Sequence, residues 1–194
     1  MTKAFSNTTI GESVLQFAAL LIKSLLLLSA LFVLLQQGSN AHAQEWDRGD
    51  TLKADLVSFE QVPSVLAPSH GKFEAQINDN ETISFELSYA NMSSAVVQAH
   101  IHFGASMTNG GVVVFLCGGN VKPPCPASGT VTGTITASDV SILPSTNVDS
   151  VIPQGIEPGN LAGLIKAIRR GDTYINVHTT NFPSGEIRGQ VRIQ

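Results

Sequence analysis

The sequence predicts an all-β fold: an antiparallel immunoglobulin-like or Greek-key sandwich or barrel, with one short helix near residues 160–170. Three observations support this prediction. Short segments in which apolar and polar residues alternate recur between residues 51 and 193. Glycine, proline, asparagine and aspartate gather between these segments, as they do in turns. Only one stretch of residues 44–194 has the apolar spacing of a helix.

The first three predicted strands cover residues 51–58, 71–78 and 82–89. In the third, polar and apolar residues alternate at every position, so one face is apolar and the other polar. Asp79-Asn80 separates the second strand from the third, which predicts a hairpin. Residues 62–68 contain two prolines, which cannot donate hydrogen bonds within a sheet, so this segment is predicted as a loop or edge.

The middle of the chain adds three predicted strands, at residues 95–103, 112–116 and 129–136. In the first of them, His100 and His102 share a face with Gln98, opposite an apolar face. Residues 112–116 are all apolar, which is typical of a strand buried on both faces. Threonine recurs at alternate positions in the last strand and suits an exposed strand face.

The predicted helix follows an irregular, proline-containing stretch. Asn160 is a candidate N-cap, and Gly171 is placed to end the helix. The apolar residues between them follow the i, i+3, i+4, i+7 spacing of an amphipathic helix: Leu161, Leu164, Ile165 and Ile168. One face of this helix is therefore expected to cover the sheet.

The chain closes with a predicted hairpin at residues 174–193, whose turn contains Pro183-Ser184-Gly185. The apolar residues of both arms point to one face. The opposite face carries His178, Glu186 and Arg188, a histidine beside a carboxylate and a guanidinium. The apolar face predicts core packing, and the polar face is the candidate functional surface.

Residues 1–43 are predicted to be a signal peptide that is cleaved after Ala43. The apolar run at residues 25–35 is shorter than the roughly 20 residues that span a bilayer, and Ala41-His42-Ala43 has the small-x-small pattern of a cleavage site. The alternative is an uncleaved membrane anchor, because residues 14–22 are also largely apolar.

Cleavage would leave a leader at residues 44–50 and one β domain at residues 51–194. Without Lys3, Lys23 and Glu12, the net charge changes from −4 to −5. An acidic surface without basic clusters argues against nucleic acid as a partner, and a membrane is expected only if the N-terminal segment is retained. The protein is therefore expected to be exported: secreted, periplasmic or at the cell surface.

Cys117 and Cys125 are predicted to form a disulfide. The loop between them is rich in turn-forming residues, and the compartments reached by export favour oxidation. A loop of this length contributes about 2–3 kcal/mol in the chain-entropy account. A thiolate metal ligand is the alternative, but no histidine lies nearby at ligand spacing.

Four segments together resemble the CHRD (chordin-type) domain, in the form found in exported microbial proteins. They are Ala99–Gly104, Asn109–Val114, Tyr174–Thr179 and Gly185–Gln190. The resemblance extends over about residues 50–193. It implies an immunoglobulin-like β-barrel distantly similar to copper-zinc superoxide dismutase. It also implies an extracellular binding role, since chordin binds bone morphogenetic proteins.

The histidines on the polar faces predict a metal site. His100 and His102 point the same way from one strand, and His178 joins them if the closing hairpin lies alongside. Three imidazoles suit copper or zinc. Around this site, Asn176, Glu186 and Arg188 are candidates for orienting an imidazole or attracting an anion.

Two other interpretations of these residues remain open. The histidines are either solvated on an outer face, or His178, Glu186 and Arg188 form a structural polar network across the hairpin. The sequence has no Gly-x-Ser-x-Gly elbow, no phosphate-binding glycine loop and no His₂Cys copper pattern.

The expected function is therefore a non-enzymatic extracytoplasmic binding or interaction module for an unidentified extracellular protein or surface ligand. The alternative is a copper- or zinc-binding protein with a superoxide dismutase-like histidine site, with or without redox activity. On the first interpretation, no catalytic residue and no cofactor are expected.

Overall fold

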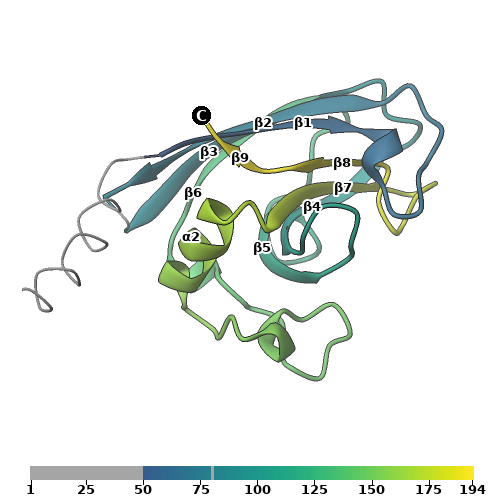
Figure 1. Cartoon of the computed structure of the whole chain (residues 1–194). Coiled ribbons are helices and arrows are strands. Elements are labelled where there is room, and N and C mark those ends of the chain that lie inside the picture. The colour runs from purple at the N-terminus through teal and green to yellow at the C-terminus, as the bar shows by residue number, and fades with distance from the viewer. Residues whose placement is uncertain (1–49, 80) are drawn as a thin grey trace, which may run out of the picture. The chain divides into compact units, whose positions relative to one another are not determined.

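The computed structural model describes residues 50–79 and 81–194. The predicted signal peptide at residues 1–43 and leader residues 44–49 lie outside this part of the chain. The described residues confirm the predicted fold class: antiparallel strands curl into a nearly closed barrel or sandwich with one short α-helix (Figure 1).

In the described part of the chain nine strands form the sheet, and β1 to β7 begin within about two residues of the predicted positions, whereas the second arm of the closing hairpin is divided into β8 and β9. Their bounds are β1 Thr51–Val57, β2 His70–Asn78, β3 Thr82–Ala90, β4 Val96–Phe103, β5 Gly111–Gly118, β6 Gly129–Ile135, β7 Thr173–Thr179, β8 Ile187–Gln190 and β9 Arg192–Ile193. Three short 3₁₀ helices lie in the connections: η1 Ser58–Glu60, η2 Ala137–Asp139 and η3 Ile152–Gln154.

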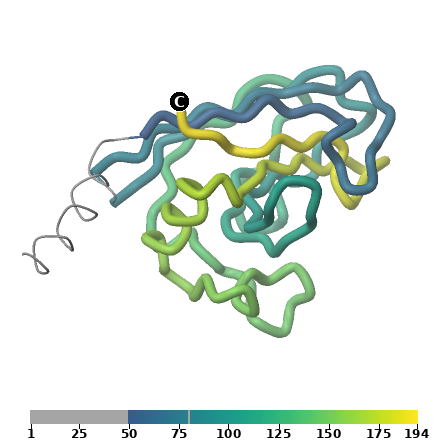
Figure 2. Tube along the Cα trace, viewed as in Figure 1, coloured from purple at the N-terminus to yellow at the C-terminus, as the bar shows by residue number. Residues whose placement is uncertain are grey.

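The strands follow the order β5-β4-β7-β8-β1-β2-β3-β6, with β9 paired to β1, and each pair of neighbouring strands is antiparallel. The predicted hairpins β2–β3 and β7–β8 are both present. The closing hairpin lies beside β4, so the strand with His100 and His102 neighbours the strand with His178 (Figures 1 and 2). This is the arrangement that a shared histidine site requires.

The helix α2 spans Leu161–Arg169 and buries the predicted apolar face in the barrel core. Asn160 caps it as expected, because its side-chain oxygen accepts a hydrogen bond from the backbone N–H of Gly163 at 2.8 Å. Gly171 follows the helix with a φ of +74°, a conformation that glycine adopts without strain. In the described residues, no helix is long and apolar enough to cross a membrane.

A disulfide joins Cys117 at the end of β5 to Cys125, and their Cα atoms are 5.1 Å apart. This confirms the predicted pairing. β5 and β6 lie at the two ends of the strand order, and the bond closes part of the loop that connects them. The free thiolate considered as a metal ligand is therefore absent from both cysteines.

Candidate metal centre

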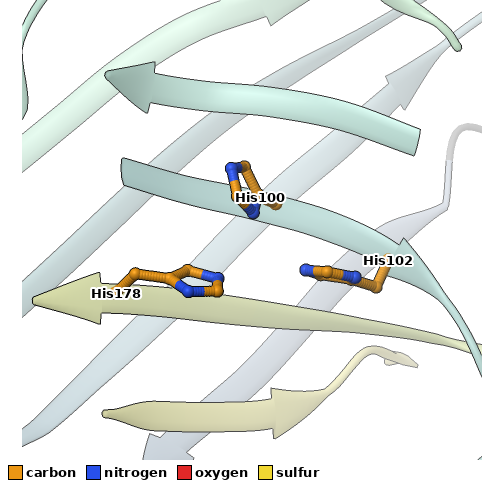
Figure 3. A group of neighbouring side chains, drawn as sticks. All are labelled: His100, His102 and His178. Carbon is orange, nitrogen blue, oxygen red and sulfur yellow. The ribbon is translucent and has the colours of Figure 1, made fainter. Parts of the chain in front are cut away.

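Three histidine side chains converge on one face of β4 and β7. His100 and His102 project from β4, and His178 projects from β7, which pairs with β4. Each ring offers a nitrogen that lies within 4.8 Å of those of the other two. Figure 3 shows the three rings turned toward a common centre. The sequence-based parity argument therefore placed all three side chains on the same face.

The cluster is buried, which contradicts the interpretation of solvated histidines. The exposed fractions of His100, His102 and His178 are 3%, 7% and 7%. Part of the cover comes from β5, because the Phe115 ring contacts the His100 ring edge to face with centroids 4.4 Å apart. Loops that follow β4 and β7 supply further cover through backbone contacts to the rings.

Those loops fix which ring nitrogen carries the proton in two of the histidines. His102 Nδ1 lies 2.8 Å from the Gly110 carbonyl oxygen, and His178 Nδ1 lies 2.9 Å from that of Pro183. A carbonyl oxygen only accepts hydrogen bonds, so each Nδ1 must donate a proton. The Nε2 atoms of these two rings then keep their lone pairs, as metal-ligating histidines do.

The nitrogens that face the centre of the cluster have no partner. In the described part of the chain, the Nε2 atoms of His102 and His178 and both ring nitrogens of His100 are buried without a hydrogen bond. A buried polar atom without a partner costs about 1–3 kcal/mol. Because each neutral ring has one lone pair, the three histidines can direct three lone pairs toward one ligand.

Burial also keeps the three imidazoles neutral. Burial, together with the neighbouring His178 and His102, lowers the pKa of His100 to about 2. Burial lowers the pKa of His102 to about 4, although the hydrogen bond to Gly110 opposes this. The pKa of His178 is lowered by burial as well. At neutral pH all three rings are uncharged, which is the form that binds a metal ion.

The donor set fits a transition-metal ion. Zinc binds imidazole nitrogen at about 2.0–2.1 Å, which places tetrahedral ligand atoms roughly 3.3 Å apart. The observed nitrogen separations of up to 4.8 Å are longer than this, so the rings would have to move closer together to share one ion. No carboxylate or thiolate belongs to this cluster, and no second cluster of three such ligands occurs in residues 50–79 and 81–194.

Arg188 contacts the surroundings of the histidines, namely a loop after β4 and the ring of Tyr174. Its guanidinium is buried and donates hydrogen bonds to the carbonyls of Thr108 at 2.8 Å and Ala105 at 3.3 Å. It also lies 3.5 Å over the ring centroid of Tyr174, and that ring stacks on His102 with centroids 4.7 Å apart. The guanidinium is therefore enclosed by the loop carbonyls and the Tyr174 ring.

Glu186 has partners of its own and does not contact the histidines by a hydrogen bond. Its carboxylate accepts hydrogen bonds from the Ser93 backbone and hydroxyl at 2.8 and 2.7 Å, and from the Thr179 hydroxyl at 2.6 Å. Burial tends to raise the pKa of Glu186, but these hydrogen bonds lower it overall. The predicted network joining His178, Glu186 and Arg188 is thus wrong.

Asn176 supports the turn that orients His178. Its side-chain oxygen accepts a hydrogen bond from the Gln61 amide at 2.6 Å, and its amide nitrogen lies 3.4 Å from the Ser184 carbonyl. A Cβ atom at Gly185 would lie 2.4 Å from the Asn176 oxygen, so only glycine lets the turn lie this close to Asn176. Asn176 thereby holds the turn that places the Pro183 carbonyl against His178.

Sequence reasoning missed several residues of the site. The carbonyls of Gly110 and Pro183 left no signal, since any residue has a carbonyl group. Gln61 and Ser93 lie on loops whose positions depend on the whole fold. Tyr174 did leave a signal, because strand alternation places it on the same face as Asn176 and His178.

Comparisons with known proteins support one family. The family model described as CHRD domain matches residues 52–191 of the chain. No curated protein and no solved structure matched the sequence.

Proposed function

The chain belongs to the CHRD domain family, and from that premise we propose that it is an exported, non-enzymatic binding domain that holds one copper or zinc ion. His100, His102 and His178 are its ligands. The observation that carries this proposal is the set of buried imidazole nitrogens without partners, two of them in rings whose Nδ1 protons are held by carbonyls.

Closure of the site argues for binding rather than catalysis. Three histidines leave a fourth coordination position on the metal, and a catalytic metal needs that position open to substrate. Here the ring nitrogens that face the centre are buried, and Phe115, Tyr174 and two loops surround the rings. An ion held in this way stabilises the folded domain and is protected from exchange with solvent.

Export is supported by chemistry outside the site. The Cys117–Cys125 disulfide suits an oxidising compartment. Copper and zinc reach such compartments, and neutral imidazoles bind both.

Elemental analysis of the purified exported protein tests the proposal. We expect about one equivalent of copper or zinc after dialysis against the metal, as three protein ligands are enough to hold one ion. His178→Gln should lower the metal content severalfold. His70→Gln is the matched control, because His70 is an exposed histidine at the start of β2 and should leave it unchanged. Wild-type protein with less than about a tenth of an equivalent would overturn the proposal.

A further inference from the structure

The strand β6 has an unpaired edge. It ends the strand order and pairs only with β3, through residues 83–89. Within the described residues, no backbone hydrogen bond other than those of this pairing involves residues 129–135. The backbone groups of β6 that point away from β3 therefore lack a strand partner, and β5 and the disulfide loop face them across a cavity.

The sequence of β6 carries none of the usual features that protect an edge against strand pairing. Natural edge strands are blunted by charged side chains, proline or bulges. The sequence of β6, Gly-Thr-Val-Thr-Gly-Thr-Ile, contains no charge and no proline, and its pairing with β3 shows no bulge. Thr130, Thr132 and Thr134 are exposed along it. Threonine pairs well with threonine or serine on a neighbouring strand.

A cavity of about 370 Å³ lies along the same edge, between β6, β5 and the disulfide loop. Its apolar lining includes Phe85, Leu116, Pro123 and Val131. Phe85 and Val131 are partly buried and pack against the core, so the cavity has an apolar floor. Lys122 also lines the cavity, but its ammonium group is ion-paired with Asp139.

We propose that β6 binds an extended peptide strand from a partner protein, with one apolar side chain of that strand inserted beside Phe85. The free backbone edge supplies the main-chain hydrogen bonds, and the cavity supplies selectivity for alternate side chains. In such a strand, successive side chains point to opposite faces. One set enters the cavity, and the other lies beside the threonine row, where small hydroxyl or uncharged side chains fit.

A small apolar molecule is the competing occupant, and it fits less well. It fills the cavity but leaves the backbone edge of β6 unpaired. A peptide strand satisfies both features at once. Because this site does not involve the histidines, the proposal stands independently of metal binding.

The test uses a synthetic probe, acetyl-Thr-Val-Thr-Leu-Thr-Val-Thr-Lys-Lys-amide, added to isotope-labelled protein. Amide hydrogen exchange at residues 130–135 should slow on binding, and the chemical shifts of β6 should change saturably. A twin peptide with N-methyl groups at alternate positions has the same side chains but lacks half of its backbone donors. It should bind at least about tenfold more weakly, the effect of losing one or two net hydrogen bonds.

Two protein variants locate the site. Val131→Lys places a charge in the cavity and should abolish binding of the probe. Val57→Lys changes an exposed valine at the end of β1 and should leave binding unchanged. Equal affinity for the methylated twin would overturn the proposal and indicate a pocket for side chains or small apolar molecules only. Absence of any β6 response to the probe would also overturn it.

Discussion

The sheet has two halves, one with β1 and β2 and one with β5, β7 and β8, and their outer faces differ in exposure to solvent. In β1 and β2, buried and exposed residues alternate, so the outer face meets water. In β7 every residue is buried, and β5 and β8 are buried at all positions except one terminal residue each. The difference arises because loops cover the outer face of the second half. Polar residues on that face therefore need partners within the protein.

Most of these buried polar groups have partners, and the exceptions cluster. Arg188, Glu186 and Asn176 make several hydrogen bonds each. In the described residues, four of the six buried side-chain atoms without a partner are imidazole nitrogens of the three histidines. In the covered half, most buried polar groups have hydrogen-bond partners, but the histidine nitrogens do not. This is the pattern expected of a ligand site.

The largest expected effect is the acid sensitivity of the half with the covered outer face. In the unfolded chain the histidines bind protons near pH 6.5, whereas burial lowers the pKa of His100 to about 2 and of His102 to about 4 in the fold. Stability is therefore complete above pH 6.5 and falls as the pH drops toward those values, by about 1.4 kcal/mol per pH unit for each histidine. Urea unfolding between pH 7 and 5, with a chelator present, measures this. A flat profile over this range would contradict the burial of neutral rings.

Arg188→Ala should give the next largest effect. It leaves the buried carbonyls of Ala105 and Thr108 without a donor and removes the contact with Tyr174. We expect a loss of about 2–4 kcal/mol in the free energy of unfolding. Arg192→Ala, at an exposed position of β9, is the control and should change stability by no more than about 0.5 kcal/mol. Similar losses in the free energy of unfolding for both variants would contradict the expected difference between the buried Arg188 and the exposed Arg192.

His100→Leu should change stability in the opposite direction. Neither ring nitrogen of His100 has a partner, so an apolar side chain removes a desolvation cost. The metal-free protein should gain about 1–2 kcal/mol and lose metal binding. Chemical unfolding with a chelator measures the gain. Destabilisation of the metal-free protein would indicate that His100 has a structural role instead.

The smallest effect is expected on the half whose outer face meets water. Lys53 and Glu74 form an exposed ion pair across β1 and β2 at 3.4 Å. Glu74→Ala should change the free energy of unfolding by less than about 0.5 kcal/mol, because solvent screens such pairs. Thermal unfolding at low and high salt measures it. A loss comparable to that of Arg188→Ala would show that the two outer faces do not differ in the way described.

The sequence predicted the exposed half more completely than the covered half. Alternation alone located β2 and β3 and their hairpin, since one face of each strand meets water. The same parity correctly placed His100, His102 and His178 on one face. It did not reveal that this face is covered, because the cover comes from loops after β4 and β7. Their positions depend on long-range contacts such as those of Arg188 and Asn176.

The roles of the surrounding residues were beyond sequence reasoning for the same reason. Glu186 and Arg188 alternate beside His178 along the hairpin, which suggested direct contact. In the fold, Glu186 turns to Ser93 and Thr179, and Arg188 turns to the loop after β4. Thr179 lies only 7 positions from Glu186, but Ser93 lies 93 positions away from it, and Ala105 lies 83 positions from Arg188. Partners this distant cannot be identified from a local pattern.

X-ray absorption fine structure of the copper- or zinc-loaded protein tests the central claim most directly. The account predicts three nitrogen neighbours at about 2.0–2.1 Å with the outer-shell scattering of imidazole rings, and a loss of one imidazole in His178→Gln. A metal surrounded mainly by oxygen atoms, or an unchanged spectrum in that variant, would contradict the assignment of His100, His102 and His178 as its ligands.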